Sequence, residues 1–349
     1  MADSAELSEA TLDQMIRAVR PEWSLLEADP AEEGTDAVYF VTVSTPAGRR
    51  ECVLKACEFL DAAEFRPEPY LLGLADRRTA IPVPSVVGAV DDHSELPAPF
   101  FLMDRCDGAV REGEVRALPT DALDRLARDA GRNIGEVHRI GSFEAFGPVR
   151  LARDTGADGG GVSLDGRRLT VAETASGSWR SRFGDFVADY CSGLDDRFAG
   201  IEADVRALVD SRLDTLDRTF DAVLGLDDYR LGNLLVDFET GATSAVLDWG
   251  NAHTMEAQYN LVLTEQYLSG WPAHDDPRRE RVRAALRAGY AETNRLETDD
   301  AFGRRRELYL GATRLLPMVC FSLWYGDADS DDAAAIAASH RDAIRDLAD

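Results

Sequence analysis

The segment "LDDYRLGNLLVDFETGATSAVLDWG", residues 226–250, decides the fold. It contains two short apolar runs, NLLVDF and TSAVLDW, joined by ETGA, and this composition predicts a β-hairpin. A hairpin places Asn233, at its start, near Asp248, at its end, and Asp228 precedes Asn233 by five residues on a polar loop. The sequence therefore predicts two carboxylates and one amide at one end of the hairpin. Oxygen ligands of this kind suit Mg²⁺.

The polar loop alone would not indicate a functional site. Asp and Asn are frequent in loops because their side chains satisfy nearby backbone groups. The ordered combination is more specific: D-x-x-x-x-N, then an apolar hairpin, then D-W-G. The protein-kinase signature has the same order, with a catalytic-loop aspartate, an asparagine five residues later and a metal-binding aspartate in D-F-G.

On these residues the chain resembles the aminoglycoside phosphotransferase and choline kinase-like family, which has the protein-kinase fold. The resemblance extends over roughly residues 25–270. In that family the loop usually reads H-G-D-x-x-x-x-N, whereas Leu226 and Asp227 replace the histidine and glycine here. The replacement predicts a different, apolar anchor for the loop and places a second acid beside Asp228.

The resemblance implies roles for the loop residues. Asp228 would orient and deprotonate the acceptor hydroxyl, and Asn233 and Asp248 would hold Mg²⁺. Phosphoryl transfer needs chiefly positioning and charge neutralisation, which these groups can supply. Arg230 has two open interpretations: it neutralises charge on the transferring phosphate, where protein kinases often have a lysine, or it is a surface arginine paired with an acid.

Lys55, in "RECVLKACEF", is the only lysine among 38 Lys and Arg residues. Strand alternation puts Val53 and Lys55 on one face of an apolar strand, and a buried lysine is rare unless it is paired. By the resemblance, Lys55 contacts the α- and β-phosphates of ATP and Val53 packs against adenine. A compact ammonium fits a narrow cleft better than a planar guanidinium does. The alternative is a lysine retained by chance at a surface edge.

The same resemblance implies the rest of a nucleotide site. Glu68, in EPYLL, would pair with Lys55, and Glu64 and Glu58 are competing candidates. Gly34 would lie in the nucleotide-binding loop, although an ordinary hairpin would also explain that segment.

The segment FFLMDRCDG resembles the hinge of the family, where backbone groups of Asp104 and Cys106 would meet adenine. His138, in IGEVH, resembles a helix-end pattern of the family and is expected to be structural.

The expected fold class is α+β, a protein-kinase-like bilobal fold with a small antiparallel sheet lobe and a larger, mainly helical lobe. The predicted boundaries are a nucleotide-binding lobe over 1–103, a hinge over 104–108 and a catalytic and acceptor-binding lobe over 109–349. The smaller lobe is predicted to contain five strands and one helix. Apolar spacing predicts a helix over 121–140. Helices are expected to dominate the remainder, apart from the β-rich island at 222–248.

Composition limits the possible partners. A formal net charge of −26 argues against nucleic acid and anionic membranes. The acidic excess, with almost no lysine, is a halophilic composition, typical of a salt-loaded cytoplasm. Five scattered cysteines indicate a reducing compartment, so a cytoplasmic location is expected. The apolar run 308–325 contains Arg314 and Pro317, which predicts a buried helix rather than a membrane span. The glycine cluster 156–166 is expected to be a loop between strands.

These observations predict an ATP- and Mg²⁺-dependent phosphotransferase that acts on a hydroxyl of a small molecule. The alternative is a catalytically inactive nucleotide-binding or scaffold protein, which the Leu226–Asp227 replacement motivates. The sequence leaves the acceptor and the oligomeric state open.

Overall fold

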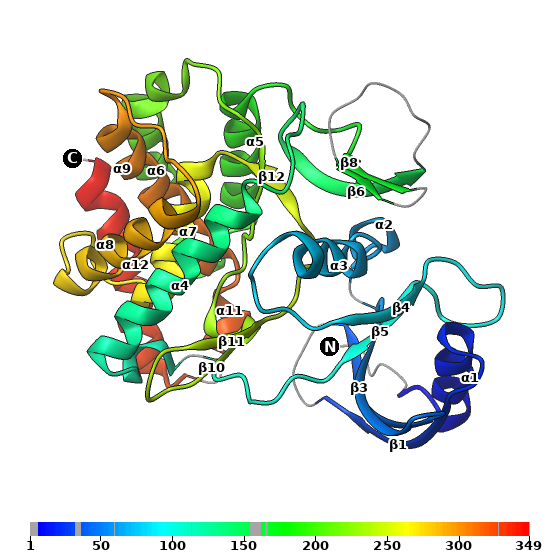
Figure 1. Ribbon diagram of the computed structural model, residues 1–349. Helices are drawn as coiled ribbons and strands as arrows, with labels where there is room; N and C mark the ends of the chain where they lie inside the picture. The colour runs from blue at the N-terminus through cyan, green and yellow to red at the C-terminus, as the bar shows by residue number, and fades with distance from the viewer. Residues whose placement is uncertain are drawn as a thin grey trace.

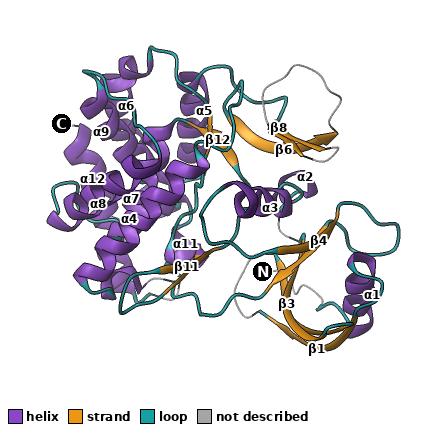
Figure 2. Ribbon diagram, in the orientation of Figure 1, coloured by secondary structure: helices purple, strands orange, loops and turns teal. Residues whose placement is uncertain are grey.

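The structure is a computed structural model with two lobes (Figure 1). It describes residues 6–31, 36–58, 60–112, 114–153, 162–164, 167–326 and 328–348. The smaller lobe is built on an antiparallel sheet, and the larger lobe is mainly helical (Figure 2). The expected α+β architecture is therefore confirmed.

The sheet of the smaller lobe has the strand order β1-β2-β3-β5-β4, and all of its pairs are antiparallel. Its strands are β1 (Ser24–Pro30), β2 (Ala37–Thr45), β3 (Gly48–Ala56), β4 (Val86–Val90) and β5 (Phe100–Asp104). Strand alternation on β3 follows the expected pattern: Cys52 and Leu54 are fully buried in the core beneath α1 (Glu9–Val19). Val53 and Lys55 occupy the opposite face.

Two helices connect β3 to β4: α2 (Ala62–Phe65) and α3 (Glu68–Arg78). In Figure 1 they lie between the small sheet and the larger lobe. Glu68 is the first residue of α3, with Pro69 in the first turn, where the missing N–H costs no helical hydrogen bond. Glu68 therefore stands at the junction of the lobes.

The larger lobe is a helical assembly with short 3₁₀ segments between its helices. Its α-helices are α4 (Thr120–Val137), α5 (Trp179–Ser192), α6 (Glu202–Arg212), α7 (Ala257–Ser269), α8 (Pro277–Thr293), α9 (Phe302–Thr313), α10 (Leu315–Val319), α11 (Phe321–Trp324) and α12 (Ser330–Ala348). The 3₁₀ segments are η1 (Glu114–Ala117), η2 (Asp196–Phe198), η3 (Leu213–Leu216) and η4 (Leu231–Asn233). Helices α4 and α8 approach very closely, because a Cβ at Gly131 would overlap the carbonyl oxygen of Leu286.

The apolar run 308–325 was expected to be one buried helix, and this prediction is wrong. The run is divided among α9, α10 and α11. Pro317 explains the first break, since its ring would clash with the carbonyl of Thr313, where α9 ends. None of the helices in the described part of the chain combines the length and the apolar character that a membrane crossing needs.

A second five-stranded sheet, in the order β7-β8-β6-β12-β9, lies in the larger lobe. Its strands are β6 (Gly147–Arg153), β7 (Val162–Leu164), β8 (Arg167–Val171), β9 (Val223–Leu224) and β12 (His253–Met255). The expectation that helices dominate outside 222–248 is therefore wrong for 147–171. Most of the glycine cluster 156–166 lies outside the described residues.

The predicted hairpin is present. It pairs β10 (Leu234–Val236) with β11 (Thr243–Val246), and Leu234 lies opposite Val246. The 3₁₀ turn η4 leads into β10, and Asp248 follows β11 by two residues. Asn233 and Asp248 therefore stand at the same end of the hairpin, as the sequence predicts.

Candidate active site

Asp228 and Asn233 contact each other directly on the loop before β10. One carboxylate oxygen of Asp228 accepts a hydrogen bond from Asn233 Nδ2 at 2.7 Å, and the other accepts one from Arg230 Nε at 2.7 Å. Burial raises the pKa of Asp228 above its ordinary value, although Arg230 opposes the effect. Because its nitrogen is held by Asp228, Asn233 has its amide oxygen left for another ligand.

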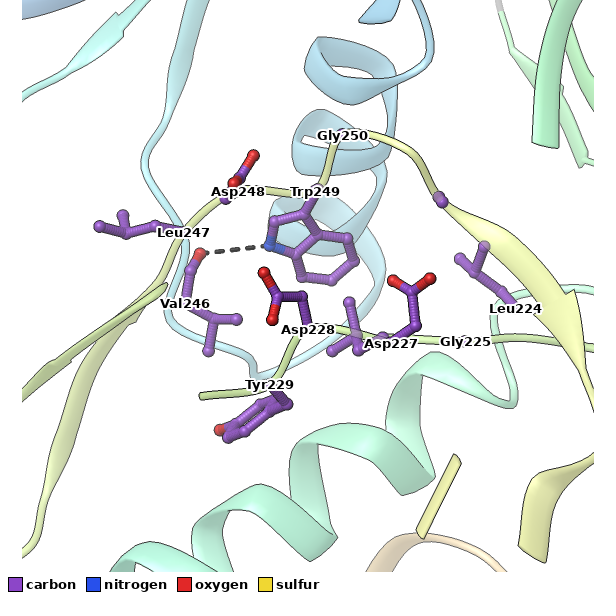
Figure 3. A pocket seen from close by; sticks show the side chains of 12 residues that line it. Leu224, Gly225, Asp227, Asp228, Tyr229, Val246, Leu247, Asp248, Trp249 and Gly250 are labelled. Carbon is purple, nitrogen blue, oxygen red and sulfur yellow. Dashed lines mark hydrogen bonds between the residues drawn. The ribbon is translucent and has the colours of Figure 1, made fainter. Parts of the chain in front are cut away.

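Asp248 has a left-handed backbone, with φ of +55°. Aspartate is among the few non-glycine residues that adopt this conformation readily. The next residue fixes the turn: the backbone N–H of Trp249 donates to Glu68 at 3.3 Å, and its indole N–H donates to the carbonyl of Val246 at 3.2 Å (Figure 3). The Asp248 carboxylate thus projects from a rigid support.

Lys55 is the centre of a group of three carboxylates. Its Nζ lies 2.8 Å from Glu68, 2.7 Å from Asp248 and 3.5 Å from Asp36. Of the candidate partners, Glu68 makes the contact, whereas Glu64 pairs with Arg150. The contact with Asp248 joins the small sheet to the hairpin of the larger lobe.

The charges of this group depend on one another. Burial lowers the pKa of Lys55, but the neighbouring carboxylates outweigh burial and hold it above its ordinary value, so the ammonium stays charged. Burial raises the pKa of Glu68 to about 7, against the opposing effect of Lys55. Burial also acts to raise the pKa of Asp248, but Lys55 outweighs it and the pKa lies below its ordinary value. Lys55 thus keeps Asp248 ionised.

The loop that contains Asp228 is anchored through the backbone of Leu226. Asn260, on α7, accepts from the Leu226 N–H at 3.1 Å and donates to its carbonyl at 2.6 Å. His138 donates from Nε2 to the same Asn260 oxygen at 3.0 Å, and its Nδ1 accepts from the Tyr290 hydroxyl at 3.0 Å. Burial lowers the pKa of His138 to about 4, so the ring is neutral at pH 7.

The expected apolar anchor of this loop is therefore only half correct. The Leu226 side chain is buried in the core, but a buried backbone also needs hydrogen-bond partners, and polar side chains supply them. His138 has the structural role that was expected, and it acts through Asn260. Asn260 could not be found from the sequence, because it lies 34 residues from Leu226 in the chain.

Arg230 forms ion pairs with Asp228 and with Glu112, which follows the expected hinge. Of its two interpretations, pairing with acids is the arrangement seen, and one of these acids is Asp228 itself. Glu112 belongs to no motif, so the sequence offered no way to find it.

Asp227 points away from Asp228, toward β12 (Figure 3). Its carboxylate lies 3.3 Å from Nδ1 of His253, the first residue of β12. Burial raises the pKa of Tyr190, on α5, and the charges of Asp227 and Asp228 raise it further. A hollow between the loop and the hairpin is lined by residues 224–229, 246–250 and 252.

Part of the hinge segment has backbone N–H donors left for a ligand. The N–H of Asp104 donates to the Ser85 carbonyl at 2.9 Å, and that of Arg105 to the Glu51 carbonyl at 3.4 Å. Within the described residues, the N–H of Cys106 has no backbone acceptor. Val53 is buried on the Lys55 face of β3. Gly34 lies outside the described residues.

The fold is that of the protein-kinase-like phosphotransferases. In agreement, the family model of APH, the phosphotransferase enzyme family, matches residues 27–308. The chain belongs to this family, and its class is that of the small-molecule phosphotransferases. No curated protein sequence matches the chain significantly.

Solved structures show the same fold. A thermostable mutant of aminoglycoside phosphotransferase APH(4)-Ia, in a ternary complex with AMP-PNP and hygromycin B, aligns with a TM-score of 0.59 at 17% identity, covering 97% of this chain and 98% of that one. A putative aminoglycoside phosphotransferase from Ralstonia eutropha JMP134 aligns with 0.60 at 15%, covering 98% of both. A microcompartment-associated aminopropanol kinase aligns with 0.53 at 18%, covering 96% of both. At these identities the likeness shows the fold alone.

Proposed function

We propose that this chain is an ATP- and Mg²⁺-dependent kinase that transfers the γ-phosphoryl group to a hydroxyl of a small molecule, with Asp228 as the base. The observation that carries the proposal is the contact of Lys55 with Asp248 at 2.7 Å. This contact brings the lysine of the small sheet to the hairpin end that also presents Asn233. In the proposed reaction, the cation that binds the phosphates and the oxygen ligands of the metal would therefore meet across the two lobes.

The donor set fits Mg²⁺. Asn233 has its amide oxygen available, and the Asp248 carboxylate is ionised and 45% exposed. Mg²⁺ binds through few protein oxygens together with substrate phosphates. When bound, the metal would neutralise charge on the phosphates, and Asn233 and Asp248 would hold it.

The other residues would position the reactants. Asp228 is fixed by two hydrogen bonds, and burial raises its pKa toward the range in which a carboxylate accepts a proton more readily. Lys55 would bind the α- and β-phosphates with Glu68 behind it, and Val53 and the Cys106 N–H would meet adenine. We also propose that 104–108 is the hinge between lobes formed by 1–103 and 109–349.

An inactive scaffold protein is the weaker proposal, because the loop that contains Asp228 remains anchored with Leu226 and Asp227 in place of histidine and glycine. Leu226 offers Asn260 the same backbone groups that any residue would offer, and the Asp227 side chain points away from Asp228. The acceptor is proposed only as a small hydroxylated molecule. Hygromycin B and aminopropanol, named with the aligned structures, are reasonable first acceptors to assay.

The test is ADP production from Mg²⁺·ATP with a panel of hydroxylated small molecules at high KCl. Asp228→Asn, which preserves shape, should lower kcat by about 10²–10⁴-fold while the Kd for Mg²⁺·ATP stays within about threefold. Asp342→Asn, on the exposed face of α12, is the charge-matched control and should retain wild-type turnover. Full turnover in Asp228→Asn would exclude Asp228 as the base.

A further inference from the structure

Asp36 is a carboxylate in an unexpected place. It lies just before β2, its side chain is 3% exposed, and one of its oxygens lies 3.5 Å from Lys55 Nζ. Its other oxygen accepts the backbone N–H of Glu58 at 3.3 Å. The group is therefore fixed beside the ammonium that would bind the nucleotide phosphates.

The contacts of Lys55 limit where a phosphate can bind. An ammonium has three N–H donors, and Glu68 and Asp248 accept from Lys55 at 2.8 Å and 2.7 Å. At 3.5 Å, Asp36 acts on Lys55 through its charge. A phosphate oxygen that accepts the third N–H at about 2.8 Å would lie within roughly 6 Å of the Asp36 carboxylate. At that separation from a carboxylate whose side chain is only 3% exposed, a second anion is repelled.

Lys55 is thus outnumbered by the carboxylates that surround it. We propose that Asp36 determines the form of nucleotide that this site accepts: it excludes metal-free nucleotide and admits nucleotide only as a complex with a divalent cation. The cation masks the phosphate charge that Asp36 would otherwise repel. This inference rests on the nucleotide site of the proposed function and adds a specificity-determining residue to it.

The experiment compares the Kd values of ATP by isothermal titration calorimetry, with Mg²⁺ and with EDTA, at constant ionic strength. Asp36→Asn keeps an oxygen for the Glu58 N–H and removes the charge. We expect it to lower the Kd of metal-free ATP by about tenfold or more and to change the Kd of Mg²⁺·ATP by less than about threefold. The matched control is Asp61→Asn, an exposed acid of the same lobe whose side chain caps nothing. Asp61→Asn should change neither Kd.

A second variant separates charge from structure. Asp36→Ala removes the charge and also the hydrogen bond to Glu58, so it should tighten metal-free ATP as Asp36→Asn does if charge is the cause. If these substitutions lower the Kd of both nucleotide forms equally, or raise both Kd values, the inference is wrong. Wild-type protein that binds Mg²⁺·ATP but shows no selectivity against metal-free ATP would overturn this inference alone. Wild-type protein that binds neither form would overturn the proposed nucleotide function as well.

Discussion

His138 links the acid stability of the fold to the position of the loop that contains Asp228. The ring is buried and neutral, with Nε2 bonded to Asn260 and Nδ1 to Tyr290. Burial lowers its pKa from 6.5 to about 4. The unfolded chain therefore binds more protons than the native protein between these two values. The stability that neutral His138 contributes is complete above pH 6.5 and is lost as the pH falls toward 4.

The magnitude follows from the two pKa values. With 6.5 in the unfolded chain and about 4 in the native protein, the free energy of unfolding falls by about 2 kcal/mol between pH 7 and pH 5. Many carboxylates also titrate in this range, so the wild-type slope alone is not diagnostic. The difference between wild type and His138→Gln removes their contribution, and this difference should shrink by about 2 kcal/mol over the same interval.

Urea unfolding followed by circular dichroism at pH 7, 6 and 5 measures this difference. His340→Gln is the matched control, because burial also lowers the pKa of His340, to about 3, but its ring contacts Arg314 and not the loop. Both variants should flatten the pH dependence of stability. Only His138→Gln should change the pH profile of kcat, since only His138 supports Asn260. A wild-type-minus-His138→Gln difference that is equal at pH 7 and pH 5 would refute the reasoning.

Three further predictions concern single contacts. Lys55→Arg keeps the charge but replaces a compact ammonium among three carboxylates with a broader, planar guanidinium. The value of kcat/KM from steady-state kinetics should therefore fall by about 10–100-fold. Wild-type rates would contradict this steric argument. Asn260→Leu leaves the buried N–H and carbonyl of Leu226 without partners. It should lower the free energy of unfolding, measured with urea, by about 2–5 kcal/mol. A decrease below about 1 kcal/mol would mean that other groups hold the loop. Gly131→Ala pushes α4 away from α8 and should lower the free energy of unfolding by more than about 2 kcal/mol. The control is Gly184→Ala on α5, where a Cβ meets open space. It should raise the free energy of unfolding by about 0.5–1 kcal/mol in the same assay. Equal effects of the two alanines would contradict the close packing.

The parts of the fold that the sequence predicts are those in which local pattern and burial agree. Alternation on β3 shows which side of the strand is core, because Cys52 and Leu54 are apolar and Lys55 interrupts the run on the other side. The hairpin before Asp248 is predicted because turn residues separate two apolar runs. In the second sheet, arginines such as Arg150 and Arg167 interrupt the apolar pattern. They form ion pairs with acids near the small lobe, which only the folded chain brings together.

In the candidate site, too, some contacts join residues that only the folded chain brings together. Glu68 could be proposed from the sequence as the partner of Lys55, but only the folded chain shows Lys55 in contact with Glu68 and Glu64 in contact with Arg150. Asp36 is one of 64 acidic residues, and nothing in its local sequence distinguishes it. Its proximity to Lys55 depends on the pairing of β2 with β3, where Val38 lies opposite Lys55. Contacts of this kind arise from strand register, which local pattern does not specify.

The replacement of His-Gly by Leu-Asp raises the question of whether this chain can transfer a phosphoryl group. The anchoring of the loop bears directly on that question, because Asn260 holds the N–H and the carbonyl of Leu226, and both groups exist whatever the side chain. The histidine of the family pattern is therefore dispensable for holding the backbone in this chain, and the leucine side chain adds apolar burial. Asp227 faces His253 and leaves Asp228 with its own two donors. The departure from the family pattern removes no group from the proposed transfer geometry, so an inactive protein would need a defect elsewhere.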